Sequence, residues 1–394
     1  MLKELSIFTA SNDIELTLGL LWRTATGVER TVDNSAPLVE LADWYGSMSG
    51  RSALEKLAER MNLAVELPSM DEIRQLFKDE LVASKALRLH RGRNVYSGSK
   101  AALWKSLWMP FRDSLTPDDN TLELLEKLVS LKTDEGGNGI DPCVELLVDR
   151  LNRLDFSVDV IREKGHAPLI RAHRPPRSCP GRVAMYSHYD VEEPAIDAWQ
   201  TDPWSLTEKK GRLYGVGVGD NKGPLAQRLV LLEQLENTPE LLWIIQGEEE
   251  IASPLAHRVM GQLVEGFQAN LWLEENGYFD SNGTQRFLAY TVGPDEKNLP
   301  PDDKLGSLLE ELEAKAKLFG CQSRIEYRSL NKSFVSEGCP FGRAMPGGAR
   351  YLAIGLNDPE SNIHRPNESI PMWTFPLHAL QFELALCTSG EKHQ

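Results

Sequence analysis

The sequence has 394 residues, of which 41% are hydrophobic and 26% are charged, with a formal net charge of −15, and this suits a globular protein of one large or two medium domains. The negative charge argues against nucleic acid or an anionic membrane as partners, and the lack of a transmembrane-length apolar run or a signal-peptide core predicts a cytoplasmic protein. Five cysteines, none in a CxxC pair, indicate neither a disulfide framework nor a cysteine zinc site.

The first part of the chain, residues 1–115, is predicted to be a separate region whose role the sequence does not assign. Helical periodicity in residues 52–62 and 70–87 indicates that this region is mainly helical. A polar break with proline and aspartate at residues 116–119 predicts a domain boundary, so that residues 116–394 form the second domain.

Basic and aromatic residues alternate irregularly in residues 85–105. Two interpretations stay open for this segment. It is either a solvated helix face with aromatic residues in the core, or a docking patch for an acidic partner or substrate tail.

From residue 120 onwards, helical and strand patterns alternate. Residues 121–131 and 143–154 have the apolar spacing of amphipathic helices, and residues 156–161 alternate like a strand. Apolar runs that are typical of buried strands follow at residues 183–186, 241–245, 269–273 and 351–356. This order predicts an α/β fold with a mixed, mostly parallel sheet flanked by helices.

Side chains that can bind a metal follow the strand at 183–186. His188 comes just after this strand and offers an imidazole nitrogen, and Asp190 is placed to hydrogen-bond the other ring nitrogen. About thirty residues later, Asp220 lies in the glycine-rich turn GVGVGDNKG, which allows the backbone to fold tightly and direct a carboxylate inward. One carboxylate can bridge two cations.

The strand at 241–245 leads into three consecutive carboxylates, Glu248, Glu249 and Glu250. Such a run at the end of a buried strand is costly, because each charge repels the next. A cation would offset this cost, with one glutamate as a ligand and its neighbour as a general base. The alternative is a charged helix start that the helix dipole favours.

Two further strand ends carry similar side chains. The strand at 269–273 ends in Glu274 and Glu275, and the loop after 351–356 contains His364. A lone histidine is more often structural than a ligand. Histidines and carboxylates at several strand ends are nevertheless what a metal crevice at the carboxyl edge of a sheet requires.

The glycine-rich turn admits a second interpretation, a nucleotide-binding loop. However, GVGVG fits neither GxGxxG nor a Walker loop, and an aspartate stands where a phosphate would lie. We therefore do not favour a Rossmann-type enzyme.

The segments SHYDVEEP, DAWQTDPWSLTEKKGRLYGVGVGDNKGP, GEEEIASP and IHRPNE together resemble those of the co-catalytic zinc peptidases and deacylases. This family includes carnosine dipeptidase, cytosolic non-specific dipeptidase, glutamate carboxypeptidase, acetylornithine deacetylase and succinyl-diaminopimelate desuccinylase, and the dipeptidase branch is nearest. The resemblance extends from about residue 120 to the end of the sequence.

The resemblance implies a role for each candidate residue. It implies one zinc on His188 and Glu275, a second zinc on Glu250 and His364, and a bridge by Asp220. Asp190 would orient His188, and Glu249 would be the general base. Counting to the strand LAYTVG favours Glu275 over Glu274 as the ligand.

The sequence departs from the family in one large feature. Members usually insert a lid domain after the strand that corresponds to residues 287–292, whereas only residues 293–304 lie here before the next matching segment. The lid supplies dimer contacts, an oxyanion histidine and a carboxylate-binding arginine in relatives that have it. We therefore expect a monomer, or a dimer through a non-lid surface. Residues 1–115 and Arg343 are candidates to replace the lid's contacts.

The resemblance implies hydrolysis of an amide bond in a short peptide or an N-acyl amino acid, with two Zn²⁺ ions that Mn²⁺ or Co²⁺ could replace. Because the lid is missing, we expect narrow specificity, with a biosynthetic intermediate as the substrate. The alternative function is that of an inactive binding or scaffold protein that retains the fold, and the complete ligand set argues against it.

Overall fold

The computed structural model describes residues 116–394, apart from residues 276, 282, 295–297, 320, 327–339 and 389–394. These described residues belong mainly to one structural unit, residues 117–313 and 322–394. The second unit of the chain consists mainly of residues 1–116. The predicted helical region 1–115 and the basic segment 85–105 therefore lie outside the described residues.

Helices account for a large part of the described unit. They are α7 (Asp119–Ser130), α8 (Ile140–Arg153), the short 3₁₀ helix η1 (Ile196–Ala198), α9 (Lys222–Gln234), α10 (Pro254–Leu263), α11 (Asp303–Leu318), α13 (Phe341–Ala344) and α14 (Thr374–Thr388).

In the described part of the chain, ten strands form the main sheet, in the order β1-β2-β6-β3-β7-β12-β9-β10, with β8 and β11 also paired to β9. The strands are β1 (Ser157–Ile161), β2 (Leu169–Arg174), β3 (Ser178–His188), β6 (Thr238–Gln246), β7 (Leu271–Glu274), β8 (Tyr278–Phe279), β9 (Gln285–Val292), β10 (Asn298–Leu299), β11 (Ser323–Glu326) and β12 (Arg350–Ala353).

The centre of the sheet is parallel. Strand β3 pairs in parallel with β6 on one side and with β7 on the other, and β7 pairs in parallel with β12. Antiparallel pairings, such as β1 with β2 and β12 with β9, lie toward the two edges. The mixed α/β sheet predicted from the sequence is confirmed. The carboxyl ends of β6, β3, β7 and β12 consequently meet at one edge of the sheet.

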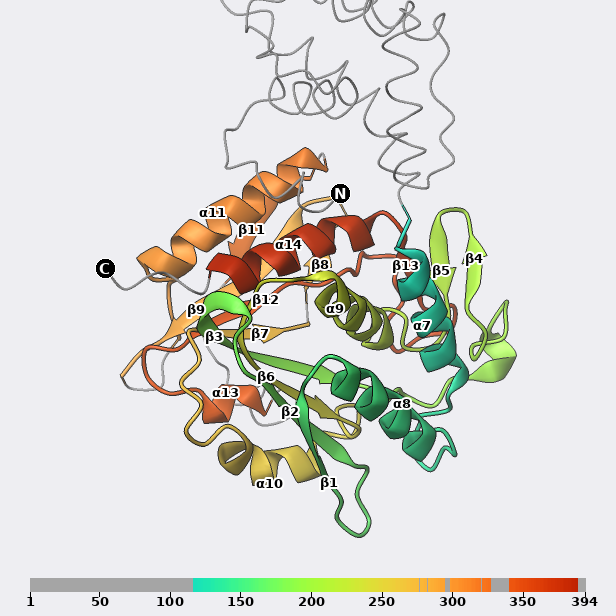
Figure 1. Ribbon diagram of the computed structural model, residues 1–394. Helices are drawn as coiled ribbons and strands as arrows, with labels where there is room; N and C mark the ends of the chain where they lie inside the picture. The colour runs from blue at the N-terminus through green and yellow to red at the C-terminus, as the bar shows by residue number, and fades with distance from the viewer. Residues whose placement is uncertain are drawn as a thin grey trace, which may run out of the picture. The chain divides into compact units, whose positions relative to one another are not determined.

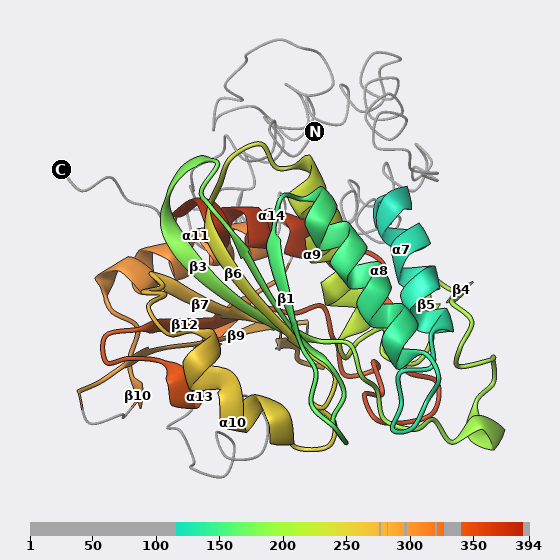
Figure 2. The ribbon, with the colours of Figure 1, turned by 60° about the horizontal axis from the view of Figure 1, so that its bottom comes forward.

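Helices cover both faces of the sheet. Helices α8, α9 and α14 lie on one face, and α10 and α13 lie on the opposite face (Figures 1 and 2). The central strands are apolar because both of their faces are covered, and Trp243 of β6 and Trp272 of β7 are almost completely buried. Helix α9 is buried along most of its length, from Lys222 to Leu232.

A second, small sheet joins two loops at the carboxyl edge. It consists of β4 (Thr207–Lys209), β5 (Arg212–Tyr214) and β13 (Ser369–Pro371), in the order β13-β5-β4. Strand β5 leads into the glycine-rich turn that contains Asp220, and β13 follows the loop that contains His364. These two loops are therefore connected by strand pairing.

The segment between β9 and α11 corresponds to the place where the family resemblance predicts that a lid is missing. Strand β9 ends at Val292 and α11 begins at Asp303, so the intervening segment is too short for an inserted domain. Among the described residues, no helix combines the length and the apolar character that crossing a bilayer requires.

Candidate metal centre

The predicted ligands come from the carboxyl ends of the central strands and from one adjoining loop. His188 is the last residue of β3, and Glu250 follows the end of β6. Asp220 lies in the turn just before α9, and the Asp220–Asn221 peptide bond is cis. His364 lies in the loop after β12. Four separate segments thus contribute side chains to one edge of the sheet.

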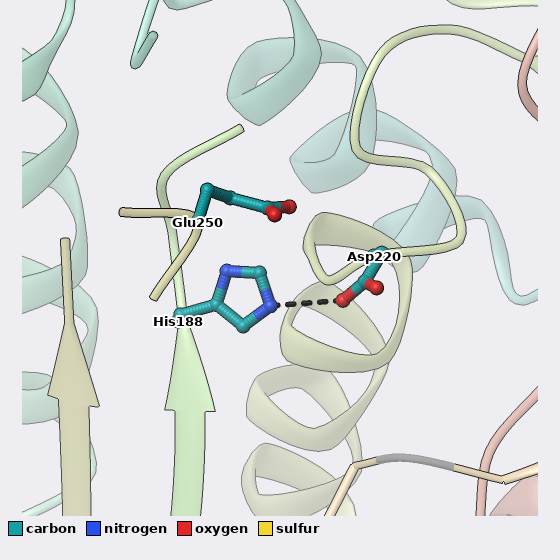
Figure 3. Close-up of side chains that lie close together, drawn as sticks. All are labelled: His188, Asp220 and Glu250. Atoms are coloured by element: carbon teal, nitrogen blue, oxygen red, sulfur yellow. Dashed lines mark hydrogen bonds and ion pairs between the residues drawn. The ribbon is translucent and has the colours of Figure 1, made fainter. Parts of the chain in front are cut away.

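Three of these residues form a close group. Ligand atoms of His188, Asp220 and Glu250 all lie within 4.8 Å of one another, and Nε2 of His188 is 2.9 Å from Oδ1 of Asp220. Figure 3 shows the His188 ring at the end of its strand, with the carboxylate of Asp220 beside one ring nitrogen and the carboxylate of Glu250 near the ring. A histidine and two carboxylates at this separation can share one cation.

His364 extends this group on the other side of Asp220. Its Nε2 lies 2.9 Å from Oε2 of Glu250 and 3.7 Å from Oδ2 of Asp220. Each oxygen of Asp220 therefore faces a different histidine, His188 or His364. This is the arrangement that a carboxylate bridging two cations needs.

Asp190 contacts both His188 and the acidic turn, which consists of Glu248, Glu249 and Glu250. Nδ1 of His188 lies 3.2 Å from the backbone oxygen of Asp190 and 3.4 Å from its Oδ1. The other carboxylate oxygen, Oδ2, accepts a hydrogen bond of 2.9 Å from the backbone N–H of Glu250. Asp190 is thus placed to orient the ring of one proposed ligand and the backbone of another.

The three glutamates of the acidic turn have different surroundings. The carboxylate of Glu248 accepts hydrogen bonds from the backbone N–H groups of Ala167 and Leu255, and it pairs with Nδ1 of His166. Glu250 faces His364. Burial, opposed by His188 and reinforced by Asp220, raises the pKa of Glu249 to about 8.

Glu274 and Glu275 also differ. The Glu274 carboxylate accepts a hydrogen bond from the hydroxyl of Tyr351. Both carboxylate oxygens of Glu275 are buried and have no hydrogen-bond partner among the described residues. Burial, reinforced by Glu274, raises the pKa of Glu275 well above its usual range. Glu275 lies outside the close group of three but interacts electrostatically with His188 and Asp220.

The electrostatics of the centre favour a cation. Burial lowers the pKa of His188, but the carboxylates of Asp190 and Asp220 outweigh this effect and raise it well above its usual value. Buried carboxylates raise one another's pKa when no positive charge offsets their repulsion. The carboxylate oxygens of Glu275, which have no hydrogen-bond partner among the described residues, are suitable ligands for a divalent cation. The other suitable ligands at this site are two imidazoles and two carboxylates, those of His188, His364, Asp220 and Glu250.

Two carboxylates near the centre were not predicted from the sequence. Oε1 of Glu192 lies 3.4 Å from Nδ1 of His364, and Glu192 forms a second possible ligand group with Glu250 and His364. Glu368 is buried and accepts hydrogen bonds from the turn that contains Asp220. Both belong to segments that carry the family resemblance, SHYDVEEP and IHRPNE, and membership in these segments is the sequence feature that could have identified them.

Arg343, a candidate to replace a contact of the lid, lies in α13, and its side chain is outside the described part of the chain.

Curated relatives match short parts of the chain. A probable di- and tripeptidase of Saccharomyces cerevisiae is 40% identical over 77 residues, which is 18% of this chain and 9% of the relative. The Beta-Ala-His dipeptidase of Mus musculus is 34% identical over 126 residues, or 28% of this chain and 25% of the relative. A probable succinyl-diaminopimelate desuccinylase of Staphylococcus aureus is 33% identical over 121 residues, or 30% of this chain and 29% of the relative. The match thus spans less than a third of each relative's length.

Solved structures support the fold over a larger share of the chain. An M20 family metallo-carboxypeptidase from Sulfolobus solfataricus superposes with a TM-score of 0.55 at 16% identity, covering 69% of this chain and 99% of that structure. Residues 184–382, which include His188 through His364, match the peptidase family M20/M25/M40. The chain therefore belongs to the peptidase family M20/M25/M40.

Proposed function

We propose that this chain is a metal-dependent hydrolase that cleaves an amide bond in a short peptide or an N-acyl amino acid. The observation that carries this proposal is the convergence of His188, Asp220, Glu250 and His364 at the carboxyl edge of the sheet, with Asp220 facing both histidines. Family membership and the names of the relatives, which are peptidases and a desuccinylase, support the same reaction class.

Two Zn²⁺ ions are the proposed cofactors. His188, Glu275 and Asp220 would hold one ion, and Asp220, Glu250 and His364 would hold the other. A set of two imidazoles with carboxylates suits zinc, and Mn²⁺ or Co²⁺ are acceptable substitutes. When bound, such ions polarise a carbonyl oxygen and make water more acidic.

The chain's own residues move the protons. Glu249 is the proposed general base, because its half-buried carboxyl interacts electrostatically with His188 and Asp220. Its neighbours have other partners, since Glu248 accepts from the backbone of Ala167 and Glu250 pairs with His364. Its carboxylate would accept a proton from the attacking water and then donate it to the leaving amine. Asp190 would keep His188 in the orientation that leaves Nε2 facing Asp220.

The proposed substrate range is narrow, with a biosynthetic intermediate as the natural substrate. Without a lid, the second wall of the site and the stabilisation of the oxyanion must come from elsewhere in the chain, and residues 1–115 are the proposed source. We propose a cytoplasmic enzyme that is a monomer or a dimer through a non-lid surface.

Metal analysis and a substrate screen test the proposal together. The full chain should take up Zn²⁺ and then hydrolyse members of one class among dipeptides and N-acetyl, N-succinyl and N-formyl amino acids. Rapid turnover of many unrelated dipeptides would contradict narrow specificity. A protein that takes up no zinc would overturn the metal-dependent reaction, and zinc uptake without turnover of any class would favour the inactive binding protein.

A further inference from the structure

Glu368 contacts the backbone of the turn that contains Asp220. Its Oε2 accepts a hydrogen bond of 2.7 Å from the backbone N–H of Gly217. Its Oε1 accepts hydrogen bonds of 2.8 Å from Gly219 and 3.1 Å from Asp220. The residue is only 4% exposed. One buried carboxylate therefore satisfies three backbone donors of the turn that contains the proposed bridging ligand.

The turn is shaped to approach this carboxylate closely. Gly217 has a φ of +75°, a conformation that favours glycine. A Cβ on Gly219 would lie 2.5 Å from Oδ1 of Asn357 and 3.3 Å from Oε1 of Glu368. Asn357 also donates a hydrogen bond of 3.1 Å from Nδ2 to the carbonyl oxygen of Gly219. The turn is thus held by side chains from the segment that also contains His364.

Glu368 also connects Asp220 to His364. It stands four residues after His364 and immediately before β13, which pairs with β5, the strand that leads into the turn. The backbone oxygen of Glu368 accepts a hydrogen bond from the N–H of Gly215. The loop that contains His364 and the turn that contains Asp220 are therefore both fixed to the same small sheet. Between them, Nε2 of His364 lies 3.7 Å from Oδ2 of Asp220.

We propose that Glu368 is a positioning residue, which holds Asp220 at the place where it can share cations with both His188 and His364. This inference rests on the proposed function. A carboxylate suits this role, because both of its oxygens accept hydrogen bonds from backbone N–H groups. A glutamine would turn an NH₂ group, itself a donor, toward some of these N–H groups.

Glu368 also places a second buried carboxylate next to Asp220, from whose backbone N–H it accepts a hydrogen bond of 3.1 Å. The three backbone N–H groups offset part of the cost of this burial. A cation at Asp220 would in addition offset the repulsion between the two carboxylates.

The test compares Glu368→Gln with Asp358→Asn in the full chain. Asp358 belongs to the same region, where its carboxylate accepts hydrogen bonds of 2.6 and 2.8 Å from Arg212 of β5, but it makes no described contact with the Asp220 turn. Thermal unfolding of the metal-free proteins would measure stability. Competition for Zn²⁺ with a chelator, at a temperature where each variant is folded by circular dichroism, would measure metal affinity.

We expect both variants to unfold at a lower temperature, and only Glu368→Gln to lose zinc affinity, by about 10- to 100-fold. If Glu368→Gln does not fold, Glu368→Asp replaces it, since it keeps the charge but withdraws the carboxylate by one methylene, and the same loss is expected. Unchanged zinc affinity in the folded Glu368 variant, or an equal loss in Asp358→Asn, would overturn the inference. A wild-type chain that binds no zinc would instead overturn the proposed function itself.

Discussion

Glu249 is the residue of the acidic turn whose charge matters most for the proposed reaction. Glu249→Gln removes the proton acceptor and preserves the size of the side chain. We expect turnover to fall by about 10²- to 10⁴-fold with zinc content unchanged, since this is the usual contribution of a general base. Steady-state kinetics and metal analysis of the same preparation measure both quantities.

Glu248→Gln is the matched control for this variant. Glu248 accepts hydrogen bonds from Ala167 and Leu255 and pairs with His166, so its replacement should lower stability and leave turnover within a few-fold. An active Glu249→Gln enzyme together with an inactive Glu250→Gln enzyme that still binds zinc would show that the base is a different glutamate.

Glu274 and Glu275 can be distinguished by the same kind of replacement. Glu275→Gln removes a buried ionisable group whose raised pKa costs the folded protein stability at neutral pH, so we expect the metal-free protein to gain on the order of 1 kcal/mol in the free energy of unfolding. Zinc uptake should fall at the same time. Glu274→Gln keeps an oxygen that can accept from Tyr351 and should bind zinc normally. Titration with Zn²⁺ and thermal unfolding measure these effects, and the opposite pattern would assign the ligand to Glu274.

The site residues differ in how far the sequence could predict them. His188, Asp220, Glu250 and His364 follow apolar strands or lie in a glycine-rich turn, and these local signals place them at one edge of a parallel sheet. Glu192 and Glu368 could not be assigned in this way, because their positions depend on how two distant loops meet. The strand pairing of β13 with β5 brings Glu368 next to the turn.

At the scale of elements, the packing of α14 on α9 contains a buried histidine. Nδ1 of His378 in α14 lies 2.9 Å from Oε1 of Gln227 in α9. Burial, reinforced by the positive charge of Arg228, lowers the pKa of His378 well below its usual value. The folded protein therefore keeps this imidazole neutral at a pH where the unfolded chain binds a proton.

This difference predicts a loss of stability in acid. Because the unfolded state binds the extra proton below about pH 6.5, the free energy of unfolding should fall as the pH decreases, by up to about 1.4 kcal/mol per pH unit for this one group. His378→Gln retains a donor for Gln227 and cannot titrate, so its stability should fall less steeply. Denaturant unfolding of both metal-free proteins between about pH 5 and pH 7 tests this, and parallel slopes would show that His378 is not responsible.

Long, strongly patterned elements were predictable, and short ones were not. The helices predicted at residues 121–131 and 143–154 correspond to α7 and α8, and the apolar run at 241–245 lies within β6. Strands β4, β5 and β13 have three residues each, which is too short for a periodic pattern, and β13 contains Pro371. Strand β13 pairs with β5, which comes from a distant part of the chain, and a local sequence pattern does not encode such a pairing.

At the scale of the whole molecule, the edges of the main sheet bear on assembly. Edge strand β1 exposes Asp159, which pairs with Arg171 of β2 at 3.4 Å. At the other edge, β10 has two residues, and β11 has four residues that include Arg324 and Glu326. Charged and short edge strands discourage pairing between sheets of two molecules. Neither edge therefore favours a dimer formed by continuous strands.

We therefore predict that a chain beginning at Pro117 folds and is monomeric. Its core is internal to the described unit, since residues such as Leu125 of α7, Leu229 of α9 and Ile244 of β6 are completely buried there. Light scattering of this shortened chain and of the full chain would compare their masses, with circular dichroism and zinc uptake to confirm folding. If the full chain is a dimer and the shortened chain a monomer, residues 1–116 form the interface. A dimer that survives the truncation would show that the described unit has an interface outside its sheet edges. A shortened chain that does not fold would refute the boundary at Pro117.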